Sequence, residues 1–258
     1  EESSSIKNAI ENYVKEVKNL TQIIIDSITL KLEKKNYIQK FVLKESFKKG
    51  LFRRIFEDNF SVADSRIVLN NLKKIKKKDL FLEENQKYFR KIFFSNYTKQ
   101  FLKISDVGLL GKMIPAFSKI DNLPQFDRFH ALSVGQHTLK AFCTLKTLGK
   151  DRSGKIYKLA KKIIKNKFNK IPLFYAVLLH DIGKGLGGDH SSKGAFIAKR
   201  LVLKFGENEK IAKEVSWLIE NHLLLSEFGF KKDIEDYSII KKISKKVDTL
   251  ERLKGIYL

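Results

Sequence analysis

Apolar residues recur at three- and four-residue steps along much of the chain, a spacing that is typical of helices packed on one face. Residues 6–32 carry one such stripe, made by Ile6, Ile10, Val14, Val17, Leu20, Ile24 and Ile28. Residues that break helices are sparse, because no glycine precedes Gly50 and the chain has only three prolines. The pattern predicts a mainly α fold.

One stretch departs from the helical spacing. Residues 60–69, FSVADSRIVL, alternate between apolar and polar positions around Ala-Asp-Ser. Alternation of this kind favours paired strands. We therefore expect one small β-hairpin within the helical chain.

The histidines divide the sequence into two parts. None occurs before the segment from Gly108 to Pro124, and all five follow it: His130, His137, His180, His190 and His222. We expect a boundary in that segment, with a helical domain over 1–107 and a second domain, which carries the chemistry, over 108–258.

The composition places the chain among globular proteins of a reducing compartment. With 43% hydrophobic residues in 258, each part can form a core. Cys143 is the only cysteine, so no disulfide framework exists. The first residues are acidic and polar, and no apolar run approaches the roughly 20 residues of a membrane span. A cytoplasmic protein without membrane contact is expected.

The net charge of +23 raises nucleic acid as a partner. We do not expect one, because only eight of the 52 basic residues are arginine and the lysines are spread along every segment. Solvated helix faces explain most of this charge. Residues 151–200, with 12 basic and 3 acidic residues, would still attract an anionic substrate.

The sequence LLHDIGKGLGGDHS, residues 178–191, holds the candidate site. It follows an apolar run that reads as a buried helix, opened near Pro172 and ended by Gly183 and Gly185. His180 and Asp181 would then lie at the inner end of a core helix, where an unpaired carboxylate costs several kcal/mol. A divalent cation bound by both side chains would remove this cost.

Three further histidines can complete a metal site. His137, His190 and His222 each belong to a different predicted helix, as in metal sites at the centre of helical bundles. Any one of them alone reads more simply as a hydrogen-bonded histidine, but the group favours a metal. The glycines would let the chain turn back so that His190 approaches His180 and Asp181.

Two other motifs overlap this stretch and are rejected. Gly183, Gly185 and Gly188 match G-x-G-x-x-G, but Asp181 and Asp189 would repel a pyrophosphate and no βαβ alternation surrounds them. The GKG triplet lacks the first glycine and the Ser/Thr of a P-loop.

The H…HD…H…H pattern of Asp181 with His137, His180, His190 and His222 resembles HD-superfamily metal phosphohydrolases. More narrowly, LLHDIGKGLGGDHSSKGA, FDRFHALSVGQHTL and VGLLGKMIPAFSKI are similar to the central region of the bifunctional uridylyltransferase/uridylyl-removing enzymes that modify the PII nitrogen-signalling protein. The resemblance is strong from about Asp106 onward and faint before it.

The resemblance implies a helical linker over 1–107 that follows a missing nucleotidyltransferase domain, then an HD-type helical bundle over 108–258 that is truncated at its C-terminus. It implies metal-dependent hydrolysis of UMP from the uridylyl-tyrosine of PII, with a bound water as the nucleophile. The implied metal ligands are His137, His180, Asp181, His190 and His222. Mn²⁺ or Mg²⁺ is expected, with Fe and Zn as alternatives.

The resemblance also bears on residues around the ligands. We place Lys184 on a phosphate oxygen, where its charge would stabilise the transition state. His130 would support the ligands from outside or be structural. Gly135 and Gln136 replace the usual Asp-Glu before the first histidine, while Ser133 and Gln136 keep an S-x-x-Q capping box.

The family's last metal aspartate would follow the final residue of this chain, so we expect an incomplete ligand shell. Asp248 could stand in for it, although it reads more simply as a solvated helix residue.

Three alternatives remain open for the function. The site could hydrolyse a different nucleotide. The chain could be a metal-free HD remnant that acts as a binding module for protein or RNA. The basic surface could instead serve RNA, as in HD-bearing tRNA-processing enzymes.

Overall fold

The computed structural model describes residues 21, 44–124, 132–148, 158–165, 170–231 and 237–258. Every regular element in these ranges is a helix, which confirms the mainly α class. Apart from Thr21, the predicted helix over 6–32 lies outside the described residues, as does His130. Within the described part of the chain, no helix has both the length and the apolar character needed to cross a bilayer.

Short helices joined by tight turns make up the first half. They are α2 (Glu45–Lys49), α3 (Leu51–Phe56), α4 (Val62–Asn71), α5 (Lys77–Leu80), α6 (Glu83–Phe94), α7 (Thr98–Asp106), α8 (Leu109–Met113) and α9 (Pro115–Ile120).

The second half contains longer helices. They are α10 (Val134–Leu148), α11 (Lys158–Lys165), α12 (Lys170–Leu179), the 3₁₀ turn η1 (Lys184–Leu186), α13 (His190–Lys204), α14 (Glu209–Glu220), α15 (Leu224–Lys231), α16 (Tyr237–Val247) and α17 (Leu250–Tyr257).

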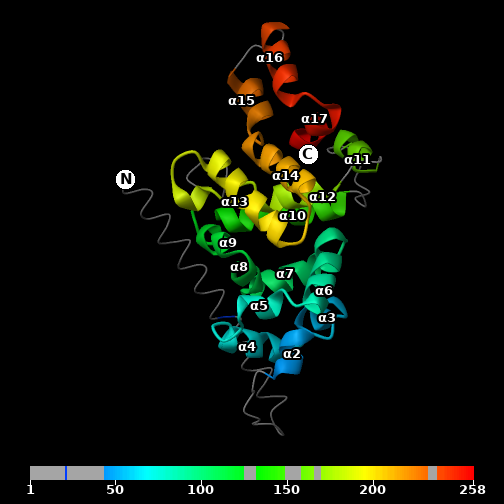
Figure 1. The fold of residues 1–258 in the computed structure, drawn as a ribbon, viewed down its shortest axis with the longest axis vertical. Coiled ribbons are helices and arrows are strands. Elements are labelled where there is room, and N and C mark those ends of the chain that lie inside the picture. Colours follow the sequence, from blue (N-terminus) through cyan, green and yellow to red (C-terminus); the bar gives the residue numbers. More distant parts are fainter. Residues whose placement is uncertain (1–20, 22–43, 125–131, 149–157, 166–169, 232–236) are drawn as a thin grey trace.

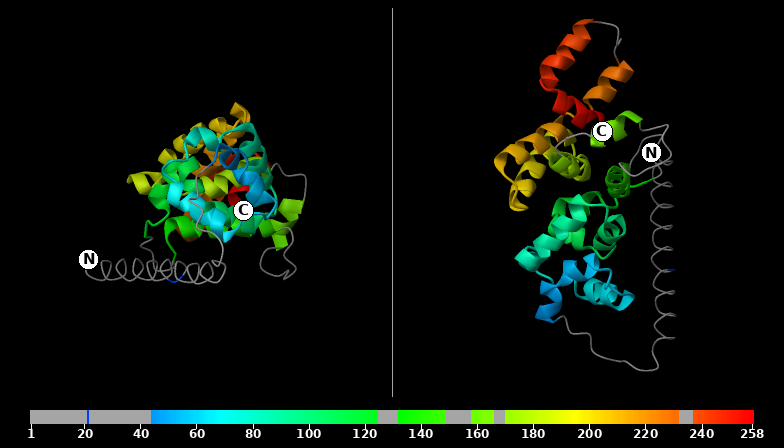
Figure 2. Two further views of the ribbon diagram at one scale, coloured as in Figure 1. Left: turned by 90° about the horizontal axis from the view of Figure 1, so that it is seen from below. Right: turned by 90° about the vertical axis from the view of Figure 1, so that its right-hand side faces the viewer.

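The helices follow one another along the long axis of the molecule. Helices α2–α6 occupy one end, α10, α12, α13 and α14 form the middle, and α15–α17 lie at the other end (Figure 1). The right-hand view in Figure 2 keeps this order, and α15 and α16 project beyond the central helices. In the centre, α14 packs against both α12 and α13, and α10 packs against α12.

One hydrophobic core joins the two halves, running from Leu51 to Ile219. The Phe93 ring of α6 lies 5.0 Å from that of Phe142 in α10 and 4.9 Å from that of Tyr175 in α12, measured between centroids. The first-half helices therefore share a core with the helices that carry the histidines. The boundary between Gly108 and Pro124 stays a prediction.

The expected hairpin at residues 60–69 is wrong, because this segment begins helix α4. The Asp64 backbone N–H donates to Ser61 Oγ, and the Ser61 N–H donates to Asp64 Oδ2, which makes a capping box. Arg54 binds the same carboxylate through both oxygens at 3.1 and 3.0 Å. The Ser-x-x-Asp start of a helix therefore overrides the apolar alternation.

Candidate metal centre

Four helix ends bring the candidate ligands together. His137 lies in the first turn of α10, and His190 is the first residue of α13. His180 and Asp181 directly follow α12, and His222 comes two residues after α14 ends at Glu220. Each histidine lies at the end of a different helix, although His180 and His222 come just after their helices and not within them as predicted. The helix before His180 ends at Leu179, earlier than the predicted stop at Gly183.

The chain doubles back between Asp181 and His190, as the sequence predicted. A Cβ atom on Gly183 would lie 2.1 Å from the His190 carbonyl oxygen and 2.8 Å from the Gly194 nitrogen. Only glycine permits this approach of α13 to the end of α12. Gly187 and Gly188 then adopt positive φ of 65° and 66°, which glycine adopts without strain.

The start of α13 is set by Asp189 and not by a ligand. One oxygen of its side chain accepts from the backbone N–H groups of Ser191 and Ser192, both at 3.1 Å. Asp189 is therefore the N-cap of α13, and it orients His190 as the first residue of the helix.

The start of α10 is held by Ser133. Its hydroxyl accepts from the Gln136 N–H at 3.1 Å, as the capping pattern predicted, and donates to the Asp121 carbonyl at 2.6 Å. A Cβ atom at Gly135 would lie 2.4 Å from Asp121 Cα. This close contact excludes any larger residue at 135, which accounts for one of the two missing acidic residues before His137.

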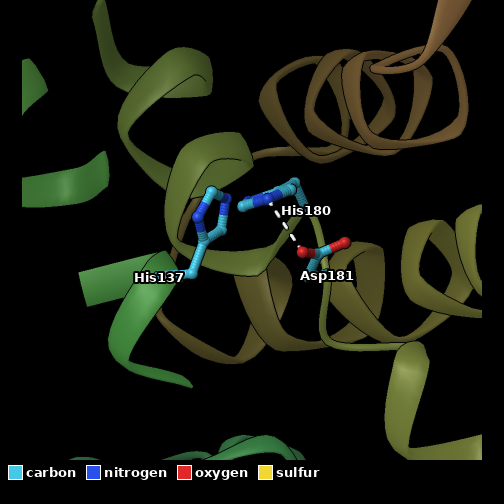
Figure 3. A group of neighbouring side chains, drawn as sticks. All are labelled: His137, His180 and Asp181. Atoms are coloured by element: carbon cyan, nitrogen blue, oxygen red, sulfur yellow. Dashed lines mark ion pairs between the residues drawn. The ribbon is translucent and has the colours of Figure 1, made fainter. Parts of the chain in front are cut away.

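The ligand atoms form two overlapping groups that share Asp181. The first contains His137, His180 and Asp181, and the second contains Asp181, His190 and His222; within each group the ligand atoms lie within 4.8 Å of one another. Figure 3 shows the first group, with the ring of His137 beside that of His180 and Asp181 on the other side of His180. Ring centroids are 5.7 Å apart for His137 and His180, and 5.3 Å for His180 and His222.

Backbone carbonyls orient two of the imidazoles. His180 Nδ1 lies 2.9 Å from the Val177 oxygen, and His222 Nδ1 lies 2.6 Å from the Ile219 oxygen. Because a carbonyl only accepts hydrogen bonds, each Nδ1 carries the proton and each neutral ring keeps a lone pair on Nε2. Both Nε2 atoms face Asp181, at 3.1 Å from Oδ2 for His180 and 3.9 Å from Oδ1 for His222. This second bond on Nδ1 is typical of metal-binding histidines.

Asp181 is the buried anion at the centre, with 2% of its surface exposed. Burial would raise its pKa, but a hydrogen bond and positive charge from His180, when that ring is protonated, and from Lys184 outweigh burial and hold the pKa well below the ordinary range. Lys184 Nζ lies 2.9 Å from Oδ2. For His222, burial is the main cause of a lowered pKa, which favours the neutral ring.

Two buried atoms at this centre make no hydrogen bond: Asp181 Oδ1 and His190 Nε2. Leaving such atoms unpaired costs about 1–3 kcal/mol each. Carboxylate oxygen and imidazole nitrogen are ordinary ligands of divalent cations. The residues present therefore fit a divalent metal ion, and their role as ligands remains a prediction.

Other residues take different places from those expected. Lys184 contacts the carboxylate of Asp181, so its predicted contact with a phosphate remains untested. Asp248 belongs to neither ligand group and pairs instead with Arg252 at 2.7 Å. The simpler expectation of a solvated helix residue is right about its exposure and wrong about the helix, because Asp248 lies between α16 and α17 with a φ of 53°.

Lys193 has a structural role that the sequence pattern did not predict. Its Nζ donates to the Gly187 carbonyl at 2.7 Å and so ties α13 to the glycine turn. The only signal in the sequence was its place three residues after His190.

Comparison with known proteins points to the family that the histidine pattern resembles. Residues 134–253 match the family model of the HD domain. The chain is 37% identical over 158 residues to the bifunctional uridylyltransferase/uridylyl-removing enzyme of Zymomonas mobilis, covering 61% of the chain and 17% of the relative. Enzymes of the same name from Ruegeria pomeroyi and Acinetobacter baumannii are 33% and 35% identical over 175 and 176 residues, which are 66% and 67% of the chain and 19% and 20% of the relatives.

The chain thus spans about a fifth of the length of these curated relatives. All five candidate ligands lie within the 120 residues that match the family model. Residues 134–253 therefore resemble the HD domain family, within a region similar to uridylyltransferase/uridylyl-removing enzymes.

Proposed function

We propose that the HD domain of this chain is a metal-dependent phosphodiesterase that removes UMP from a uridylylated protein, with uridylyl-tyrosine on PII as the substrate. The names of the relatives support the uridylyl-removing reaction. The observation that carries the proposal is the buried Asp181, whose unpaired Oδ1 and neighbouring Nε2 atoms form a ligand set on four helix ends.

The residues that would hold the metal are His137, His180, Asp181, His190 and His222, with Asp181 common to both groups. A divalent ion supplies a water of lowered pKa and a positive charge for the phosphate oxygens. Mn²⁺ or Mg²⁺ suits a phosphodiester substrate, and an imidazole-rich set also accepts Fe or Zn.

The chain's own groups would prepare the site in three ways. The Val177 and Ile219 carbonyls hold His180 and His222 in the tautomer that binds a metal. The low pKa of Asp181 keeps it ionised at any physiological pH. Lys184, beside Asp181, would supply a positive charge close to the scissile phosphate.

The test compares Asp181→Asn with Asp248→Asn. Both changes replace a carboxylate by an amide of the same shape, but Asp248 is paired with Arg252 away from the ligand groups. Each protein is incubated with Mn²⁺, its bound metal is measured, and UMP release from uridylylated PII is followed. Circular dichroism verifies that each variant is folded.

We expect Asp181→Asn to lose metal and at least 100-fold in rate, while Asp248→Asn keeps both. Equal metal content in all three proteins would contradict the site. Metal binding by the wild type without UMP release would contradict the reaction and favour the alternative of a binding module.

A further inference from the structure

A hollow of about 400 Å³ opens between η1 and α13. It is lined by Leu186 of η1 and by Ser192, Lys193, Phe196 and Ile197 of α13. Its surface is almost entirely apolar, although the segment that surrounds it is strongly basic. The metal centre as described does not use it.

The residues that line the hollow lie close in sequence to the candidate metal ligands. Leu186 lies five residues after Asp181, and α13 starts with His190. Because a helix rises 1.5 Å per residue, Phe196 lies about 9 Å along α13 from His190. Six residues turn the helix by about 240°, so a ligand anchored at His190 by its phosphate would pass over the first turn of α13 to reach the hollow.

One of the lining residues is an exposed aromatic ring. Phe196 is 64% exposed, whereas the buried face of α13 is made by Gly194, Ala195, Ala198 and Val202. The Arg200 guanidinium lies 5.7 Å from the centre of the Phe196 ring. An exposed phenylalanine beside a guanidinium can stack on a planar heterocycle, whose polar edge the guanidinium can contact, and offers less to an aliphatic chain.

The side of the hollow formed by η1 and the glycine turn is fixed to α13 before any ligand binds. Lys193 Nζ donates to the Gly187 carbonyl, and so joins the loop after η1 to α13. Gly188 packs on the same amine, since a Cβ atom there would lie 3.2 Å from Nζ. Because this loop is already held in place, little conformational entropy would be lost when a ligand binds.

We propose that this hollow is a base subsite, in which the pyrimidine ring of the uridylyl group stacks on Phe196 while its phosphate lies at the metal ligands. The inference rests on the proposed function, because it names where that substrate's base would lie. Arg200 and Lys193 place positive charge beside the carbonyl oxygens of the pyrimidine ring.

The test measures binding of UMP and of ribose 5-phosphate to the Mn²⁺-loaded chain by calorimetry. Ribose 5-phosphate keeps the phosphate and the sugar but has no base. The variants are Phe196→Ala and Phe196→Tyr, and the control is Leu250→Ala, because Leu250 is also 64% exposed but lies on α17. None of these surface changes removes a core side chain.

Stacking of one base on an aromatic side chain corresponds to an affinity change of about 5- to 160-fold on alanine substitution. We expect Phe196→Ala to weaken UMP by this factor and to leave ribose 5-phosphate unchanged. Phe196→Tyr and Leu250→Ala should bind both ligands as the wild type does.

Equal affinity of the wild type for the two ligands, including no measurable binding of either, would overturn the base subsite. So would an equal loss of both ligands in Phe196→Ala. The proposed function is tested separately by metal content and UMP release in Asp181→Asn, so each can fail without the other.

Discussion

Replacement of Gly183 by alanine should open the metal centre. A Cβ atom at this position would lie 2.1 Å from the His190 carbonyl oxygen, whereas ordinary van der Waals contacts begin at 3.4 Å. The colliding atoms are backbone atoms of His190 and Gly194, which cannot rotate away. The start of α13 would therefore have to retreat by about 1.3 Å from the end of α12.

This retreat separates His190 from Asp181. Overpacking of this kind costs about 1–3 kcal/mol of stability. A displacement of about 1 Å at a catalytic centre can lower the rate about 100-fold. We therefore expect Gly183→Ala to lower both the free energy of unfolding and the metal affinity.

The assay combines urea unfolding with a Mn²⁺ titration. Gly229→Ala is the matched control, because Gly229 lies within α15 and a Cβ atom there meets nothing within 4 Å. Alanine in a helix is favoured over glycine by about 1 kcal/mol, so this variant should be slightly more stable and bind metal normally. If Gly183→Ala kept wild-type stability and metal affinity, the close packing of α12 and α13 would not shape the site.

Three further predictions concern stability. Ser61→Ala should remove the α4 capping box and cost about 1 kcal/mol in urea unfolding, and no loss would contradict the helix start seen here. Glu207→Ala should lower the free energy of unfolding by about 1–3 kcal/mol, because Arg90 and the Tyr175 hydroxyl lose their shared partner. The control, Glu209→Ala, changes an exposed side chain and should lower it by less than about 0.5 kcal/mol. Burial lowers the pKa of Lys146 from 10.5 to about 8. Between these values the unfolded chain binds more protons, so stability should rise by about 1.5 kcal/mol from pH 8 to 9.5, and Lys146→Met should abolish this rise.

The approach of His190 to His180 and Asp181 could be predicted because it depends on local signals. His180 and Asp181 follow an apolar run, and the glycines between Asp181 and His190 indicate a turn. Local signals also misled at residues 60–69, where the alternation hid a Ser61–Asp64 capping box. The evidence for the helix was present in the sequence and was outweighed by the apolar pattern.

The early end of α12 and the burial of Lys146 could not be predicted in this way. His180 binds the Val177 carbonyl through its side chain, which replaces a backbone bond at the helix end. Lys146 is 3% exposed because its ammonium donates to the Ile92 and Phe93 carbonyls at the end of α6. These partners lie more than 50 residues away along the chain, so no local pattern could identify them.

The most direct measurement of the central claim is an anomalous difference map from crystals of the chain grown with Mn²⁺. The account predicts a peak at bonding distance from Asp181, shared with His190 and His222 or with His137 and His180. Crystals of Asp181→Asn should lack this peak. A map with Mn²⁺ bound elsewhere and no density among these five side chains would contradict the metal centre.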